Sequence, residues 1–158
     1  MGRYRYFITI CTNKKQLLFN HKETVENCIQ LLDEKSKLMG FKVWAYCFMP
    51  DHLHLLLEGD KLDSDLKRFI SAFKQSAGYS YSKNFKTAKL SDSKPRNLAQ
   101  SFSSAGNGKL WQPSYYDHVL RKDEDLEGVI QYIFNNPVRK GIVAHYVEYP
   151  FLGPLEKT

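Results

Sequence analysis

Residues 48–57 read FMPDHLHLLL and decide how the middle of this 158-residue chain folds. Pro50 and Asp51 favour a tight turn, and they separate two segments rich in strand-forming residues, 41–49 and 52–58. Strands that follow one another through so short a turn pair in antiparallel fashion. The sequence therefore predicts a β-hairpin at the centre of the fold.

The second strand of this hairpin carries two histidines within a run of leucines. Because side chains on a strand alternate between its two faces, His52 and His54 point the same way, about 7 Å apart, while the leucines between and after them point to the core. Two imidazoles at this spacing can converge on one divalent ion. A histidine in a strand is more often a polar residue satisfied by hydrogen bonds, so the pair alone does not establish a metal site.

Hydrophobic periodicity predicts three helices around the hairpin. The first covers residues 22–39 and ends at Gly40, the second starts near Asp63 or Ser64, and the third covers Asp123–Asn136 with Asp123 as its N-cap and Pro137 as its end. Further strands are expected at 5–12 and from Trp111 onward. The order β-α-β-β-α-β-α favours the α+β class: a ferredoxin-like antiparallel sheet with helices packed on one face and a C-terminal tyrosine-bearing helix.

Length and composition are those of a single globular domain over residues 1–158, with 42% apolar and 25% charged residues. No apolar run is long enough to cross a bilayer, and the N-terminal residues lack the features of a signal peptide. We therefore expect a cytoplasmic protein without a membrane partner.

Positive charge is concentrated in one segment of the chain. Residues 83–109 contain six cations and one anion, so they carry five of the six net positive charges. The sequence at about 84–109 is also rich in Ser, Asn and Gly, which predicts a mobile basic loop. On the second helix Lys67 and Lys74 lie on one stripe that could follow a phosphate backbone, although a solvated helix face explains the stripe equally well.

The third helix contains a candidate nucleophile, Tyr132. At 100° per residue, Tyr132 and Asn136 share a face beside the apolar stripe, whereas Asn135 points away. A phenol and an amide oxygen one turn apart could meet over a metal held by the histidines, and such a donor set suits Mg²⁺ or Mn²⁺. Tyr132 is one of ten tyrosines, so the position alone does not make it catalytic.

Three segments together resemble the single-tyrosine transposases of bacterial insertion sequences and their relatives associated with repetitive extragenic palindromes. They are FMPDHLHLLLEG at 48–59, WQPSYYDHVLR at 111–121 and YIFNNPVRKGIV at 132–143. The resemblance implies a metal-dependent DNA strand transferase of the HUH class, in which Tyr132 attacks single-stranded DNA and forms a 5′-phosphotyrosine link. It also implies that His52, His54 and Asn136 bind the divalent metal, Mg²⁺ or Mn²⁺.

The expected partner is single-stranded or hairpin DNA, contacted by Lys67, Lys74 and Arg121, and a homodimer is left open. Two other functions are consistent with the same residues. A non-catalytic module could bind single strands through the aromatic side chains of a ferredoxin-like sheet. A metal phosphohydrolase could use the histidines with water as its nucleophile.

Overall fold

The computed structural model describes residues 2–90, 107–121 and 124–155, and its centre is a five-stranded antiparallel sheet. The strands lie in the order β4-β1-β3-β2-β5. This confirms the predicted α+β class and the hairpin at its centre. The C-terminal strand β5, which pairs with β2, was not predicted. The bounds of the strands are β1 Arg5–Cys11, β2 Phe41–Met49, β3 His52–Gly59, β4 Tyr116–Leu120 and β5 Leu152–Leu155.

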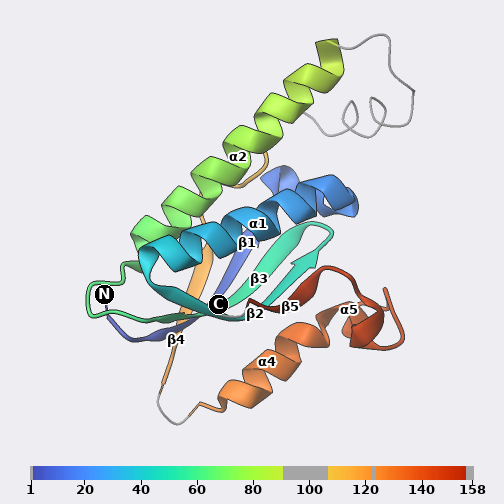
Figure 1. Cartoon of the computed structure of the whole chain (residues 1–158). Helices are drawn as coiled ribbons and strands as arrows, with labels where there is room; N and C mark the ends of the chain where they lie inside the picture. Colours follow the sequence, from blue (N-terminus) through green and yellow to red (C-terminus); the bar gives the residue numbers. More distant parts are fainter. Residues whose placement is uncertain (1, 91–106, 122–123, 156–158) are drawn as a thin grey trace.

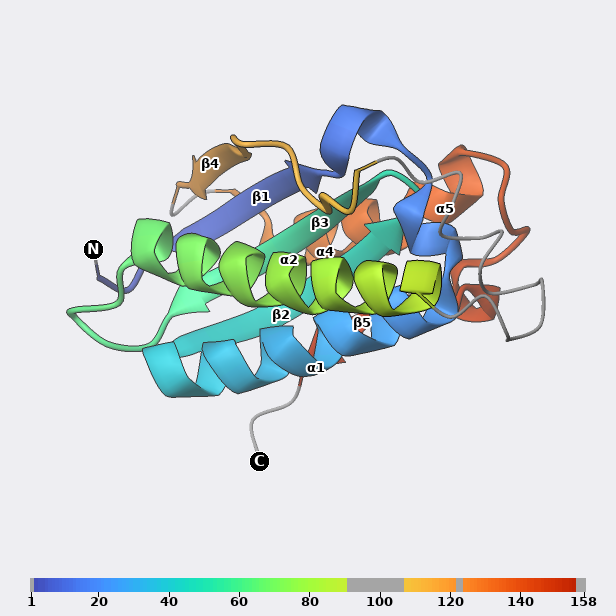
Figure 2. The same cartoon turned by 90° about the horizontal axis from the view of Figure 1, so that it is seen from above.

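Helices cover both faces of the sheet. Figure 1 shows α1 (Lys22–Met39) and α2 (Leu66–Leu90) on one face, and α4 (Leu126–Phe134) with the short α5 (Asn136–Arg139) on the other. Figure 2 shows from above that α1 and α2 lie side by side over the strands. Short 3-10 helices at Asn13–Lys15, Leu18–Asn20 and Tyr146–Glu148 connect these elements.

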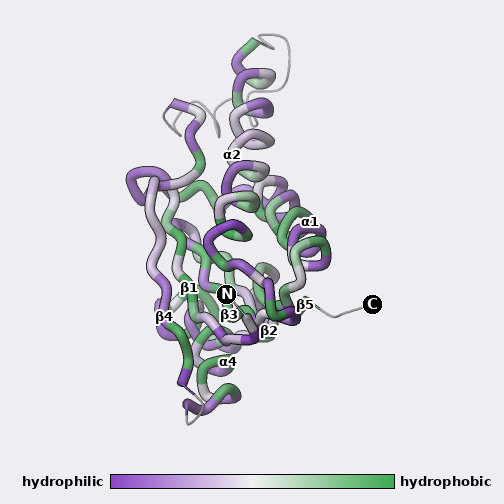
Figure 3. Tube along the Cα trace, turned by 90° about the vertical axis from the view of Figure 1, so that its left-hand side faces the viewer, coloured by the Kyte–Doolittle hydropathy of each residue, from purple (hydrophilic) through white to green (hydrophobic). Residues whose placement is uncertain are grey.

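The alternation of β3 supplies side chains to both layers. Leu53, Leu55 and Leu57 are fully buried in the main core, where they pack with the apolar faces of α1 and α2. Leu56 points the other way and belongs to a smaller core beneath α4. Figure 3 shows the hydrophobic segments of the central strands between the two helical layers. Since His52 and His54 alternate with the leucines of the main core, they lie on the α4 side of the sheet.

A β-bulge at Trp44 shifts, from odd to even numbers, the residues of β2 that face the main core. Val43 pairs with Leu57 and Ala45 pairs with Leu56, so Trp44 is an extra residue on β2. Before the bulge the odd-numbered residues point into the main core. After it they point into the smaller core, and the even-numbered residues take their place in the main one. The end of β2 beside the histidines is therefore apolar on both faces.

The tip of the β2–β3 hairpin is held by hydrogen bonds from a neighbouring segment. The backbone N–H of Thr12 donates to the carbonyl of Asp51 at 2.9 Å, and its hydroxyl lies 3.0 Å from the same oxygen and 2.7 Å from the carbonyl of Gln16. The N–H of Phe19 donates to the carbonyl of Pro50 at 3.0 Å. Because Thr12 is fully buried, these bonds are shielded from water, and they fix the turn that precedes His52.

Two predicted boundaries are wrong. The predicted loop from about residue 84 begins too early, because Tyr81 and Phe85 continue the buried stripe of α2 at a spacing of four residues and the helix runs to Leu90. Residues 91–106 of that loop lie outside the described residues, and 107–109 form no helix or strand. The strand predicted from Trp111 forms only an isolated bridge there, between Trp111 and Thr12, and regular pairing with β1 starts at Tyr116.

The tyrosine helix is shorter than predicted. It begins at Leu126 with Asp125 as its N-cap, whose carboxylate accepts a hydrogen bond from the N–H of Glu127; the predicted cap, Asp123, lies outside the described residues. The helix ends at Phe134, and Asn136 opens α5 instead of lying on the same helix as Tyr132. The break follows from Pro137, which has no N–H to donate to the previous turn.

None of the helices in the described part of the chain combines the length and the apolar character needed to span a membrane.

Replacing Thr12 by valine tests how the hairpin tip is held. Thr12→Val keeps the shape of the side chain but leaves buried carbonyls without the hydroxyl donor, so we expect the free energy of unfolding to fall by about 1–3 kcal/mol. Thr12→Ser retains the hydroxyl and should lose less. Urea denaturation followed by circular dichroism measures both variants, and equal losses would show that the hydroxyl does not contribute.

Candidate active site

The two predicted metal ligands meet on the α4 side of β3. The Nε2 atoms of His52 and His54 lie 3.0 Å apart, and their rings are nearly perpendicular, with an interplanar angle of 80°. The two nitrogens are within hydrogen-bonding distance of each other, so both face the narrow space between the rings. This convergence is the geometry that the alternation of the strand predicted.

The other ring nitrogen of each histidine is held by a neighbouring side chain. His52 Nδ1 lies 2.5 Å from a carboxylate oxygen of Asp51, and His54 Nδ1 lies 2.9 Å from the hydroxyl of Thr9. Histidines that bind metals usually have this second hydrogen bond, which sets the tautomer and the orientation of the ring. The pair thus fits a divalent ion bound through both Nε2 atoms.

In the part of the chain that the structure describes, His52 and His54 are the side chains of His, Cys, Asp or Glu type that could contribute to such a site. Within the described residues, no group of three or more of these side chains is arranged to hold a metal ion. Further ligands would have to be amide oxygens, water or phosphate oxygens of a substrate. A site of this composition keeps open positions, as catalytic metal sites do.

Burial keeps His54 neutral. Its side chain is only 9% exposed, and desolvation, the neighbouring His52 and the charge of Arg139 together lower the pKa of His54 to about 3. A neutral imidazole has a free lone pair, which is the form that binds a metal. His54 is therefore ready to act as a ligand over the whole range of physiological pH.

Tyr132 lies on the same side of the sheet and is joined to the histidines through Phe7. The Phe7 ring stacks on His54 with centroids 5.5 Å apart, and its edge meets the ring of Tyr132 at 6.1 Å with an interplanar angle of 81°. Tyr132 is 52% exposed, whereas the next residue of the helix, Ile133, is fully buried. The phenol is thus anchored beside the histidines and remains open to a large substrate.

Arg139 is a site residue that the sequence analysis missed. Its guanidinium carbon lies 4.0 Å from the centroid of the Tyr132 ring, and its charge reaches His54, whose pKa it lowers. The break at Asn135 and Pro137 brings α5 back over the tyrosine. The signal in the sequence was the basic pair Arg139 and Lys140, placed directly after the Asn-Pro break.

Asn136 is buried, with 4% of its surface exposed, at the start of α5. It lies in the layer that covers β2 on the histidine side of the sheet. Metal binding by its amide remains a prediction.

The three predicted DNA-binding residues lie in different surroundings. Lys67 is exposed on α2, across the sheet from Tyr132, and Arg121 is exposed just after β4, where its backbone N–H bonds Glu124. Lys74 is half-buried, and its ammonium donates to the carbonyls of Gln112, Pro113 and Ser114 at 2.8–3.3 Å. These bonds use all three of its donors, so a phosphate contact by Lys74 would have to break them.

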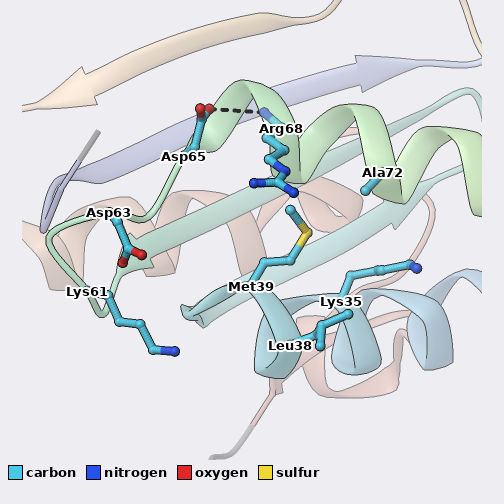
Figure 4. A pocket seen from close by; sticks show the side chains of 8 residues that line it. All are labelled: Lys35, Leu38, Met39, Lys61, Asp63, Asp65, Arg68 and Ala72. Carbon is cyan, nitrogen blue, oxygen red and sulfur yellow. Dashed lines mark hydrogen bonds between the residues drawn. The ribbon is translucent and has the colours of Figure 1, made fainter.

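A cavity of about 520 Å³ opens in the other helical layer, between the end of α1 and the start of α2. Figure 4 shows Met39 from α1 facing Arg68 from α2, with the N–H of Arg68 bonded to Asp65. The sheet separates this cavity from the histidines and Tyr132. This cavity is therefore not part of the candidate active site.

Comparison with known proteins connects the chain to transposases. A model of the family described as IS200-like transposases matches residues 1–136. The REP-associated tyrosine transposase of Escherichia coli K12 is 21% identical over 151 residues, which is 95% of this chain and 74% of that protein. A Haemophilus influenzae relative whose name also includes REP-associated tyrosine transposase is 28% identical over 111 residues, or 70% of this chain, and the chain spans only 57% of its length.

Solved structures share the fold. A REP-associated tyrosine transposase bound to a REP hairpin aligns with a TM-score of 0.68 and 19% identity, covering 96% of this chain and 77% of the other. A crystal structure of a Deinococcus radiodurans protein aligns with a TM-score of 0.57 and 21% identity, covering 85% and 92%. The predicted fold is confirmed by both.

The lowered pKa of His54 predicts how stability changes with pH. Above pH 6.5 His54 is neutral in both the folded and the unfolded protein. Below pH 6.5 the imidazole takes up a proton in the unfolded chain, whereas in the folded protein it stays neutral down to about pH 3. The free energy of unfolding should therefore fall as pH decreases from 6 to 4, with His54 contributing up to about 1.4 kcal/mol per pH unit.

Urea denaturation in EDTA at several pH values measures this contribution. His54→Gln should make the pH dependence shallower than in the unmodified protein, while the control His145→Gln, at an exposed position, should leave it unchanged. Parallel curves for the unmodified protein and His54→Gln would show that His54 takes up protons freely in the folded state.

Proposed function

The chain belongs to the family of IS200-like transposases, and we propose that it cleaves and rejoins single-stranded DNA with Tyr132 as the nucleophile. The observation that carries this proposal is the contact of one phenylalanine with both halves of the site. Phe7 stacks on His54 and meets Tyr132 edge to face, so the nucleophile and the histidine pair are packed against the same side chain.

The reaction exchanges one phosphodiester for another. Tyr132 Oη forms a bond to phosphorus while the bond from phosphorus to the 3′ oxygen breaks, which gives a 5′-phosphotyrosine and a free 3′ end. The proton lost from the phenol is balanced by the proton that the 3′ oxygen gains. Attack by another 3′-hydroxyl reverses these steps at a new junction, so bond energy is conserved and no nucleotide cofactor is needed.

Two parts of the chain would orient the phosphate for this attack. Arg139 carries a positive charge next to the ring of Tyr132, where it can neutralise a phosphate that approaches the phenol. His52 and His54 would hold a divalent ion, Mg²⁺ or Mn²⁺, with the amide of Asn136 as the predicted third ligand. When bound, the ion would supply Lewis acidity toward a phosphate oxygen.

All of these residues belong to one chain. Tyr132, Arg139 and the histidine pair are brought together by contacts within a single copy, without a second subunit. We therefore propose that the active site forms within one protomer. The hairpin in the related complex suggests the substrate, and we propose that this chain acts on single-stranded DNA next to a hairpin.

A covalent adduct tests the proposal directly. Labelled single-stranded hairpin DNA, incubated with the protein and Mn²⁺ and separated on a denaturing gel, should give a band that migrates with the protein. Tyr132→Phe should abolish the band, because the phenyl ring has no oxygen to join to phosphorus, and His52→Ala should reduce it strongly.

Tyr79→Phe is the matched control, since Tyr79 is 72% exposed on α2 and lies across the sheet from the site. Its adduct should equal that of the unmodified protein. An adduct that persists in Tyr132→Phe would identify another nucleophile. DNA binding without any adduct would favour the non-catalytic binding module, and turnover without an adduct would favour the phosphohydrolase.

Arg139 should contribute to the rate of adduct formation. Arg139→Gln removes the charge beside the phenol, and we expect the rate to fall about a hundredfold, as when a charge-stabilising donor is removed from other active sites. Lys140→Gln, a change of the same charge at the next exposed residue, should have little effect on a quenched time course. Equal rates for the two variants would show that Arg139 does not contact the phosphate.

A further inference from the structure

A groove of about 360 Å³ lies between β4 and α4, immediately beside the proposed nucleophile. Tyr132 and Phe7 both line it, so it shares two walls with the candidate active site. His118 also lines the groove; it lies opposite Phe7 in the pairing of β4 with β1 and therefore faces the same side of the sheet. A phosphate next to Tyr132 would place one of its flanking nucleotides at this groove.

The lining selects against a phosphate and for a nucleobase. Glu124 and Asp125 bring two carboxylates, and no lysine or arginine is among the described residues that line the groove. A phosphate placed there would meet like charges at close range, because the nearby cations Arg121 and Arg139 do not line the groove. Leu120, Val129 and the ring of Phe7 offer apolar surface, against which the flat face of a base can pack.

The carboxylate of Glu124 is held in a fixed position. His118 Nε2 donates to one of its oxygens at 2.9 Å, and the backbone N–H of Arg121 donates to the other. These two hydrogen bonds also lower the pKa of Glu124, which keeps it ionised. Each oxygen retains a further lone pair, so the group can still accept hydrogen bonds from a ligand.

From this arrangement we infer that the groove is a binding subsite for a nucleobase with an exocyclic amino group, on a nucleotide flanking the cleaved phosphate. Glu124 accepts a hydrogen bond from that amino group, as carboxylates do from the N4 amino group of cytosine. Thymine presents an oxygen in the same place and is disfavoured. This subsite deepens the proposed strand transfer and rests on it for the position of the phosphate.

Cytosine and thymine make the sharpest test, because both are pyrimidines and differ at the group that Glu124 would contact. A hairpin DNA with a randomised single-stranded flank is incubated with the protein and Mn²⁺, and the protein-linked and released strands are sequenced on either side of the cut. Within two nucleotides of the cut, one position should show cytosine about tenfold over thymine, the effect of one hydrogen bond to a charged group.

Two variants assign that preference to the groove. Glu124→Gln supplies an amide that can donate to the oxygen of thymine, so the preference for cytosine over thymine should disappear or reverse. Glu127→Gln removes the same charge from the exposed side of α4, outside the groove, and should leave the preference for cytosine unchanged. Adducts without a preference, or with one that Glu124→Gln leaves unchanged, would overturn the inference and leave the strand-transfer proposal intact.

If no adduct forms at all, the strand-transfer proposal fails, and binding still decides the subsite. Fluorescence anisotropy with Tyr132→Phe compares hairpin DNAs whose flanks contain only cytosine or only thymine. Tighter binding of the cytosine flank, lost in the double variant with Glu124→Gln, would support the subsite. Equal affinities would refute it.

Discussion

The alternation of side chains along β3 is the constraint on which both the fold and the candidate site depend. One face of the strand is buried in the main core through Leu53, Leu55 and Leu57. His52 and His54 must therefore lie on the opposite face. A shift of one residue in the pairing would bury the histidines among the leucines of α1 and α2. The hydrophobic effect that fixes the register of the sheet therefore also directs the imidazoles.

A second requirement is that the rings of the site be held in place before any substrate arrives. His52 is bonded to Asp51, in the turn that Thr12 holds, and His54 is bonded to Thr9 on the neighbouring strand. These partners belong to the sheet and to the turn between β2 and β3, whose backbone is held by the hydrogen bonds of Thr12 and Phe19. Tyr132 and Arg139, by contrast, come from a thin helical layer and are exposed. The histidine pair is thus held by hydrogen bonds to its neighbours, while Tyr132 lies in an exposed layer that a large substrate can reach.

The sequence was most informative where one periodic pattern dominated. The bounds of α1, the hairpin and the shared face of His52 and His54 follow from local spacing, and all agree with the structure. The sequence was least informative where contacts between distant segments determine the surroundings of a side chain. Phe7 joins His54 to Tyr132 across three elements, and Lys74, which looks like a free cation on a helix face, is bound by carbonyls 38 to 40 residues away.

The end of the tyrosine helix shows the same limit. An uninterrupted helical pattern placed Asn136 one turn above Tyr132, but Pro137 divides the segment and makes Arg139 the residue that returns to the tyrosine. Proline was read as the end of a helix, and what followed it could not be derived, because the direction of α5 depends on how it packs under β2. The spacing of residues in the sequence predicts which side chains are neighbours within one helix or strand, but not which are neighbours across a break such as the one at Pro137.

The additional residue at Trp44 has an evolutionary consequence. Because Trp44 is the extra residue, Val43 and Ala45 occupy successive positions of the ladder, opposite Leu57 and Leu56, and both halves of the strand contribute to both cores. Loss of Trp44 alone would join Val43 to Ala45 and leave Ala45, Cys47 and Met49 in the smaller core, with Tyr46 and Phe48 in the main one. Relatives can therefore differ in length by this one residue without turning a core side chain, whereas loss of a paired residue elsewhere in β2 would exchange the two faces of the strand beyond it.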